Sequence, residues 1–303
     1  MTHTTATRPV ARPDLPRRAP EARERTGLTR TQRFFAFPAT WAVIGIAAIV
    51  LVDSLFINVG SGLGTVGAIV GAVLGGVVAV LVHRFVMHRL ARRAVPELAA
   101  RGALRQGLQG IALGAGFILA SIGIVTLLGG FSLSWHPVDA VSTIALAIGI
   151  NLGTAAVEEI VFRGLAFQAI EKLFGAGRGT WIALAVTALF FGGAHMLNPG
   201  ATLWSGLAMS IEAGVLTGAA FMWRRNLWFV MGIHFAWNAL EGLFGIAVSG
   251  HRDPSLLLTV ATGPTAISGG AFGVEASIVP VIISLALSVP MILAARRRTS
   301  VPR

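Results

Sequence analysis

Eight long runs of apolar residues constrain this chain more than any other feature. A helix needs about 20 such residues to cross the hydrocarbon core of a bilayer. Glycine-rich turns, proline or clustered arginine separate the runs. The expected spans are 37–58, 63–86, 107–131, 139–162, 180–198, 203–222, 227–248 and 275–295. The sequence therefore predicts an all-α polytopic membrane protein with about eight transmembrane helices.

Composition supports this class and limits the domain organisation. Hydrophobic residues make up 54% and charged residues 12% of the 303 residues, whereas soluble domains carry about 25% charged residues. We expect residues 34–298 to form one multi-span membrane domain. Residues 1–33 are rich in Arg and Pro and are expected to be a disordered basic cytoplasmic tail. Residues 299–303 are expected to be a short cytoplasmic C-terminal tail.

The distribution of basic residues predicts the orientation of the spans. If the N-terminus is cytoplasmic and eight spans follow, 23 of the 24 Lys and Arg residues fall on the cytoplasmic side, and only Arg252 lies outside. This bias predicts a protein of the cell membrane with both termini in the cytoplasm. It also accounts for the net charge of +11, so a nucleic-acid partner is not expected.

Three short motifs place polar side chains inside the apolar spans. Ionisable groups at membrane depth cost several kcal/mol unless they are paired or face a polar cavity, so they indicate function. At about 1.5 Å per residue, counting from the intervening turn puts the first two motifs at similar depth on antiparallel helices. The third reaches the same cytoplasmic half of the membrane. The motifs are Glu158-Glu159-Ile-Val-Phe-Arg163, Phe191-Gly-Gly-Ala-His195 and His234-Phe-Ala-Trp-Asn238. The sequence thus predicts a polar intramembrane cavity lined by residues capable of proton transfer.

Spacing within the motifs suggests individual contacts. Glu159 and Arg163 are four residues apart on one helix face, so we expect them to pair, although Arg163 could instead reach toward the membrane edge. We expect Phe191, one turn before His195, to pack beside it. The helix that carries the first motif is expected to continue past the membrane edge and to end at Gly175.

Two further acidic residues lie outside this set. Glu241 follows His234 by seven residues, on the same helix face, and is expected at the edge of the cavity. Glu212, in the sixth span, is expected to be a buried hydrogen-bonding partner.

The three motifs, in this order on the fourth, fifth and seventh spans, resemble the CPBP family. This family includes CAAX prenyl endopeptidases and bacteriocin-immunity proteins. The resemblance covers about residues 140–245. It implies an intramembrane endopeptidase that acts on prenylated or other membrane-associated peptides.

The resemblance also implies a role for each motif residue. Glu158 and His195 would activate the attacking water, and His234 and Asn238 would stabilise the oxyanion. Glu159 and Arg163 would hold the helix in place.

The cofactor prediction is that no metal takes part, because a glutamate base suffices for peptide hydrolysis once a second group holds the water. The alternative is a zinc ion held by Glu158, His195 and His234. The sequence has no His-Glu-x-x-His motif, and it has no cysteine for a thiolate ligand or nucleophile.

Two functions of other classes remain open. A proton-coupled transporter would also bury acidic and histidine side chains, but such transporters commonly contain repeated halves, and no repeat is evident in the sequence. A non-catalytic scaffold or immunity protein would keep the fold and bind a partner. Loss of proteolysis rather than of partner binding in Glu158→Gln would distinguish the peptidase from the scaffold.

Overall fold

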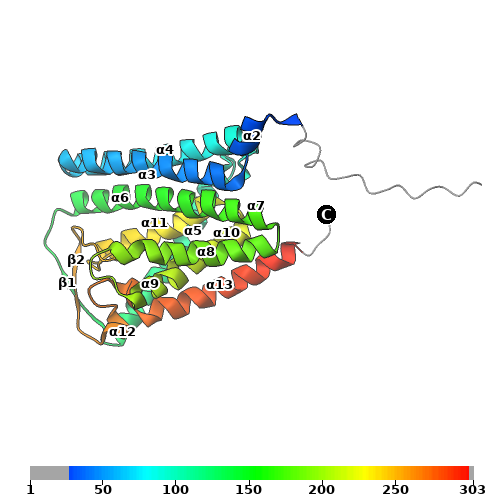
Figure 1. Cartoon of the computed structure of the whole chain (residues 1–303). Helices are drawn as coiled ribbons and strands as arrows, with labels where there is room; N and C mark the ends of the chain where they lie inside the picture. Colours follow the sequence, from blue (N-terminus) through cyan, green and yellow to red (C-terminus); the bar gives the residue numbers. More distant parts are fainter. Residues whose placement is uncertain (1–26, 300–303) are drawn as a thin grey trace, which may run out of the picture.

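The structure, a computed structural model, describes residues 27–299 and is dominated by helices (Figure 1). The all-α class is confirmed. Most of the expected N-terminal tail and residues 300–303 lie outside the described residues. Within the expected tail, however, α2 (Arg30–Phe35) forms a helix that begins with a capping box at Thr29. The prediction of disorder is therefore wrong for residues 30–33, because Thr29 and Gln32 satisfy the first amide groups of this helix.

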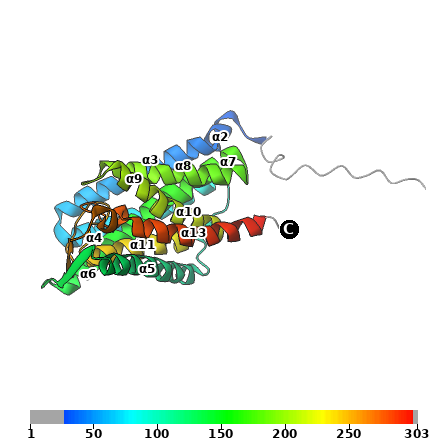
Figure 2. The same ribbon diagram turned by 90° about the horizontal axis from the view of Figure 1, so that it is seen from below.

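The described residues form eight helical passes, and these run side by side along the molecule (Figures 1 and 2). Three of them contain a stretch of π-helix, a wider turn than the α-helix. They are α3 (Pro38–Gly62), α4 (Gly64–Phe85) with η2 (Val86–Leu90), α5 (Ala103–Leu127), α6 (Ala140–Glu159) with η4 (Ile160–Phe167) and α7 (Gln168–Phe174), α8 (Arg178–Ala194) with the 3-10 turn η5 (His195–Leu197), α9 (Leu203–Met209) with η6 (Ser210–Val215) and α10 (Leu216–Arg224), α11 (Leu227–Leu243), and α13 (Ile278–Thr299).

Seven of these passes, all except α11, are long and apolar enough to cross a membrane. The eighth, α11, has only 17 residues and ends at Leu243, five residues before the predicted end of the span at 248. A helix in contact with lipid must match the bilayer thickness. Because 13 of the 17 residues of α11 are buried, protein rather than lipid surrounds most of this helix, and a shorter length is tolerated.

Two passes form the interior of the bundle. The most apolar part of Leu203–Arg224 is 83% buried, whereas the corresponding parts of the other candidate spans are 17–39% buried. Together with α11, this pass is enclosed by the other helices. Polar side chains on these inner helices therefore face protein instead of lipid, which is where a site within the membrane can be built.

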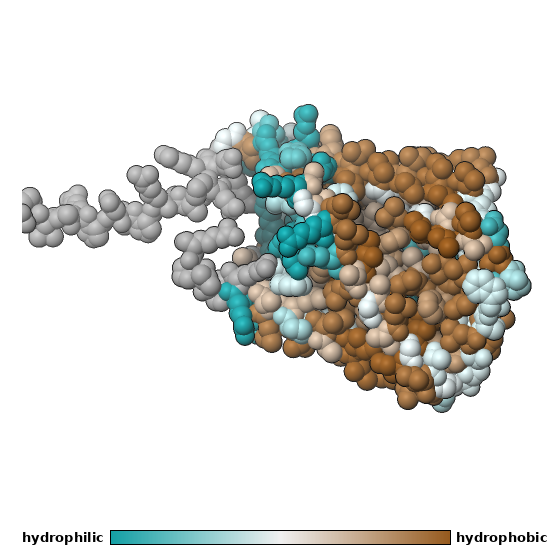
Figure 3. All heavy atoms as spheres, turned by 180° about the vertical axis from the view of Figure 1, so that it is seen from behind, coloured by the Kyte–Doolittle hydropathy of each residue, from teal (hydrophilic) through white to brown (hydrophobic). Residues whose placement is uncertain are grey.

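The outer surface is mainly apolar, with hydrophilic residues gathered at the end of the molecule that carries α2 (Figure 3). Large side chains such as Leu51 (71% exposed) and Phe190 (70% exposed) point outward from the bundle. A soluble protein would rarely expose so much contiguous apolar surface. The chain is therefore an integral membrane protein, in which lipid covers this surface.

The end opposite α2 is closed by short elements. Strand β1 (Phe131–Trp135) pairs antiparallel with β2 (Leu257–Ala261), and α12 (Thr265–Ser268) and the 3-10 turn η7 (Val274–Ala276) precede α13.

The 3-10 turn η3 (Pro96–Leu98) lies between α4 and α5. The third span was predicted to reach residue 131, but α5 ends at Leu127 and a strand follows.

Two glycines bring α5 against α11. A Cβ atom at Gly110 would lie 2.1 Å from the carbonyl oxygen of Phe229, and one at Gly114 would lie 2.2 Å from that of Ile233. Only glycine allows backbones to approach this closely, as in other membrane helix pairs. Ile233 precedes His234, so this contact fixes the helix that carries the third motif.

Candidate active site

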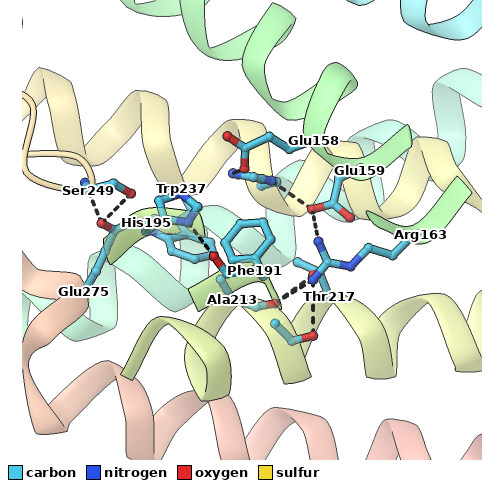
Figure 4. A network of polar contacts seen from close by, with 12 residues as sticks. Glu158, Glu159, Arg163, Phe191, His195, Ala213, Thr217, Trp237, Ser249 and Glu275 are labelled. Atoms are coloured by element: carbon cyan, nitrogen blue, oxygen red, sulfur yellow. Dashed lines mark hydrogen bonds and ion pairs between the residues drawn. The ribbon is translucent and has the colours of Figure 1, made fainter. Parts of the chain in front are cut away.

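Glu159 joins the first and third motifs. Its side chain is fully buried, and one oxygen, Oε1, accepts hydrogen bonds from Arg163 Nη1 at 3.1 Å and from His234 Nδ1 at 2.9 Å (Figure 4). The predicted Glu159–Arg163 pair is confirmed. A buried carboxylate needs such partners, because an unpaired charge in the interior is strongly destabilising.

Arg163 connects the fourth pass to the inner helices. It is also fully buried, and its Nη2 donates to the carbonyl oxygens of Ala213 at 3.3 Å and Gly214 at 3.2 Å. Its guanidinium carbon lies 4.9 Å from the centre of the Phe191 ring. Arg163 does not reach toward the membrane edge. It fastens η4 to η6.

The π-helical geometry explains how Arg163 finds these carbonyl groups. Glu159 is the last residue of α6, and Arg163 lies in η4, while Ala213 and Gly214 lie in η6. A π-helical turn displaces the usual backbone hydrogen bonds and is frequent at functional sites. The expected regular α-helix through the first motif is therefore replaced by a wider turn from Ile160 onward. The helix still ends as predicted, before Gly175.

His234 is held by ring contacts with Trp237 and Phe191 and by contacts at both nitrogens. Because a carboxylate only accepts hydrogen bonds, Nδ1 carries the proton that is donated to Glu159. This leaves Nε2 directed toward Glu158, whose Oε2 lies 3.8 Å away. One face stacks on Trp237, with ring centres 5.6 Å apart, and Phe191 meets the ring edge-on at 6.0 Å. The imidazole is thus fixed in position and tautomer.

His195 lies where α8 changes into the 3-10 turn η5. Its Nδ1 is 2.7 Å from the carbonyl oxygen of Phe191, so Nδ1 donates and Nε2 is left as a hydrogen-bond acceptor. The ring stacks on Phe191 at 4.8 Å, which confirms the predicted contact. His195 is half-buried, and Phe191 separates it from Arg163 and His234.

Glu158 and Asn238 have fewer partners. The Glu158 side chain is 26% exposed, and within residues 27–299 no hydrogen bond or ion pair joins it to His195. The carboxylate instead faces His234. Asn238 is 5% exposed, and its Oδ1 is buried without a partner among the described residues. Both side chains therefore retain unused hydrogen-bonding capacity next to the fixed histidines.

Three further carboxylates extend the site beyond the predicted set. Glu241 accepts a hydrogen bond from Trp237 Nε1 at 3.0 Å, and it is fully buried rather than at the edge of a cavity, because Trp237 draws it inward. Glu212 is buried, but no partner of its two carboxylate oxygens lies among the described residues, so the predicted hydrogen-bonding role is not seen.

Glu275 is a carboxylate of the site that the sequence analysis did not select. It lies in η7, outside the spans, and accepts from the amide and hydroxyl of Ser249 at 2.6 and 2.9 Å (Figure 4). Burial raises the pKa of Glu275 to about 7, although the hydrogen bonds from the Ser249 hydroxyl and amide oppose this increase. In the sequence it is the first residue of the expected span 275–295, a position at the membrane edge that does not by itself indicate a role.

The spacing of the possible metal ligands bears on the cofactor prediction. Among residues 27–299, no three His, Asp or Glu side chains are grouped so that they could hold one ion. In particular, Glu158 faces His234 while His195 lies on the other side of Phe191. The metal-free reaction and the zinc alternative that combines Glu158, His195 and His234 both stay predictions.

Fold and site together define a polytopic membrane protein with a buried cluster of glutamate, histidine, arginine and asparagine side chains. Residues 140–240, which contain the three motifs, match the family model described as Type II CAAX prenyl endopeptidase Rce1-like. This match agrees with the CPBP resemblance and indicates a peptidase. No curated protein and no solved structure matches the chain.

Proposed function

We propose that this protein is an intramembrane endopeptidase that hydrolyses a peptide bond with water activated by Glu158 and His195. The observation that carries the proposal is the fixed tautomer of His195. Its Nδ1 is bound to the Phe191 carbonyl at 2.7 Å, so its Nε2 can accept a hydrogen bond from water. The match of residues 140–240 to a peptidase family supports the same reaction class.

The proposed reaction requires only general acid–base chemistry. The carboxylate of Glu158 takes a proton from the water while the water oxygen attacks the carbonyl carbon of the scissile bond. Glu158 then gives this proton to the leaving amine as the carbon–nitrogen bond breaks. His195 orients the water through Nε2. The partial exposure of Glu158 leaves its carboxylate accessible for this exchange.

His234 and Asn238 would stabilise the oxyanion that forms on the carbonyl oxygen. With Nδ1 donating to Glu159, His234 needs a second proton before Nε2 can also donate. Glu158 at 3.8 Å and Glu159 at 2.9 Å supply negative charge on either side of such an imidazolium ring. The amide group of Asn238 adds a second donor one helical turn away.

Glu159 and Arg163 are positioning residues in this proposal. Glu159 fixes the tautomer and orientation of His234, and Arg163 ties the fourth pass to η6. Such supporting contacts keep reacting groups within a small distance of their productive geometry.

An apolar groove of about 380 Å³ favours the hypothesis that the substrate carries a hydrophobic chain. Such a substrate would be a prenylated peptide or another membrane-associated peptide. The groove lies between α4, α5, α6 and α11, and its walls include Ala156 and Phe235. Each of these residues is within two positions of Glu158 or His234. The proposed location is the cell membrane with both termini in the cytoplasm, as the distribution of basic residues predicts.

The test is cleavage of a fluorogenic peptide library, with prenylated and plain members, by the detergent-purified protein. Glu158→Gln keeps the shape of the side chain and removes the base, and Asp253→Asn is a matched control at an exposed carboxylate. We expect wild type and Asp253→Asn to cleave at equal rates and Glu158→Gln to be inactive. A parallel reaction with a strong zinc chelator should leave the rate unchanged.

Three results would contradict the proposal. Cleavage that persists in Glu158→Gln excludes this residue as the base. Activity that is lost with chelator and restored by zinc assigns the reaction to a metal. Absence of cleavage by well-folded wild-type protein, across the library, favours the scaffold or transporter.

A further inference from the structure

A second cavity, of about 770 Å³, opens at the basic end of the molecule, far along the helices from the β1–β2 pair. It lies between α2, the start of α3, the segment after η2 and the end of α7. Its walls include Arg33, Arg92, Arg93 and Lys172, together with the apolar residues Phe37 and Ala91. The residues that line it include four basic side chains and, among those described, no acidic one.

The four basic side chains differ in how far their charge is already balanced. Arg93 binds Glu97 Oε1 at 2.6 Å and Gln168 at 2.6 Å, so it is part of the protein framework. Within residues 27–299, Arg33 donates only its Nε, to the Leu28 carbonyl at 3.1 Å, and no described residue binds its terminal nitrogens. Arg92 has no hydrogen bond or ion pair with any residue in the described part of the chain. Among the described residues, Arg33 and Arg92 therefore present positive charge to the cavity that no carboxylate balances.

The backbone holds Arg92 in an uncommon conformation. Its φ angle is 55°, in the left-handed region that residues other than glycine seldom adopt. The next residue is anchored on both sides, because the Arg93 amide donates to the Met87 carbonyl at 2.9 Å and its side chain binds Glu97. Surrounding contacts that maintain such a conformation are typical of binding sites.

Aromatic residues place this cavity at the level of lipid headgroups. Phe34, Phe35 and Phe37 are 61%, 37% and 51% exposed, and they lie beside Arg33 at the point where α3 begins. Exposed apolar side chains of this size beside basic residues mark a surface in contact with a membrane, and basic pockets at the cytoplasmic ends of membrane helices bind anionic headgroups. A ligand at this position would have a phosphate in the cavity and apolar chains along the outer surface.

We propose that this cavity binds the phosphate headgroup of an anionic phospholipid. Arg33 and Arg92 contact the phosphate, and Phe37 packs against the glycerol and the first part of the acyl chains. Because Lys172 and Leu173 of α7 form one wall, the lipid connects α2 and α3 to the extension of the helix that carries Glu158. This site is separate from the proposed active site and does not depend on its function.

The test uses thermal unfolding of the full-length protein in neutral detergent. Added probes are a short-chain phosphatidylglycerol, a short-chain phosphatidylcholine of the same acyl length, and inorganic phosphate. We expect only phosphatidylglycerol to raise the unfolding temperature in a saturable manner. At about 1 kcal/mol for each basic group near the headgroup, Arg33→Gln and Arg92→Gln should each weaken its apparent affinity about fivefold, and the double variant about 30-fold.

Arg105→Gln is the matched control, because Arg105 is an exposed arginine of the same basic region that does not line the cavity. It should bind phosphatidylglycerol as the wild type does. Equal stabilisation by phosphatidylcholine, equal stabilisation by inorganic phosphate, or unchanged affinity in the double variant would each overturn the proposal. The readout needs no peptidase activity, so this result is independent of the proposed reaction.

Discussion

At the scale of single residues, Glu159 and Arg163 form the buried ion pair in which opposite charges of the site neutralise each other. Glu159 Oε1 accepts from both Arg163 and His234, while Arg163 also binds two carbonyl groups of η6. Neither side chain is exposed. Removing one member of such a pair leaves the other as an unpaired buried charge, whereas removing both leaves neutral groups.

Arg163→Gln is therefore expected to destabilise the protein by about 3–5 kcal/mol. Glu159→Gln combined with Arg163→Gln should lose less stability than Arg163→Gln alone, because no unpaired charge remains. Thermal unfolding in detergent measures both, with the exposed Arg178→Gln as the control for loss of a basic residue. A double variant less stable than the single one would show that the pair is not coupled in this way.

Glu275 gives the protein a pH-dependent stability. Burial raises its pKa from the usual 4.5 to about 7, so the folded state binds a proton more tightly than the unfolded state between these values. Its contribution to stability therefore falls as pH rises from about 4.5 to 7. Glu97 works in the opposite sense: burial raises its pKa, but hydrogen bonds from His83 and Arg93 outweigh this and hold it well below its usual value, so its contribution stays constant above about pH 5.

We expect Glu275→Gln to remove this part of the pH dependence. The difference in unfolding temperature between variant and wild type should be small at pH 5 and should grow in favour of the variant toward pH 8. The glutamine oxygen can still accept from Ser249, so the local contact is preserved. The same difference at all pH values would contradict the raised pKa.

At the scale of helices, close packing of α5 on α11 fixes the third motif. Gly114→Ala would place a Cβ atom 2.2 Å from the Ile233 carbonyl oxygen, so α11 must move and His234 with it. We expect a loss of about 1–3 kcal/mol in stability and reduced cleavage. Gly116→Ala in the same helix has open space around its Cβ and should be neutral or stabilise by up to about 1 kcal/mol. Equal effects of the two substitutions would show that the contact is not important.

Much of the structure of these helices could be predicted from the sequence. The continuous fourth helix, its end before Gly175 and the Glu159–Arg163 pair all follow from apolar length, glycine preference and four-residue spacing. The π-helical stretches η4 and η6 could not be predicted, because they depend on packing between segments about 50 residues apart, such as Arg163 on Ala213. Glu158 faces His234 rather than His195. This preference depends on side-chain torsion angles, whereas counting residues from a turn gives only the depth of each residue in the membrane.

At the scale of the whole molecule, the bundle has a hydrophilic end (Figure 3), where basic residues such as Arg33 and Arg92 lie, and an opposite end that carries the β1–β2 pair (Figure 1). We call the first of these the basic end. The described start and end of the chain, at α2 and α13, lie at the basic end. From the positive-inside rule we propose that this end faces the cytoplasm. Because the chain has no cysteine, single cysteines can report this orientation without removal of native thiols.

We expect Leu63→Cys and Asp253→Cys to react with a membrane-impermeant thiol reagent on intact cells. Leu63 connects α3 to α4, and Asp253 lies in the segment before β2. Arg101→Cys and Ala176→Cys, at the basic end, should react only after the membrane is permeabilised. The reverse labelling pattern would invert the proposed topology.

The most direct test of the central claim is the rate of peptide hydrolysis by Glu158→Gln and His195→Gln on one cleavable peptide. His88→Gln, an exposed histidine outside the site, is the matched control. Loss of a general base costs about 10²–10⁴-fold in rate. We predict a loss in this range for Glu158→Gln, a clear loss for His195→Gln, and an unchanged rate for His88→Gln. Wild-type rates in Glu158→Gln, with the protein correctly folded, would contradict water activation by this site.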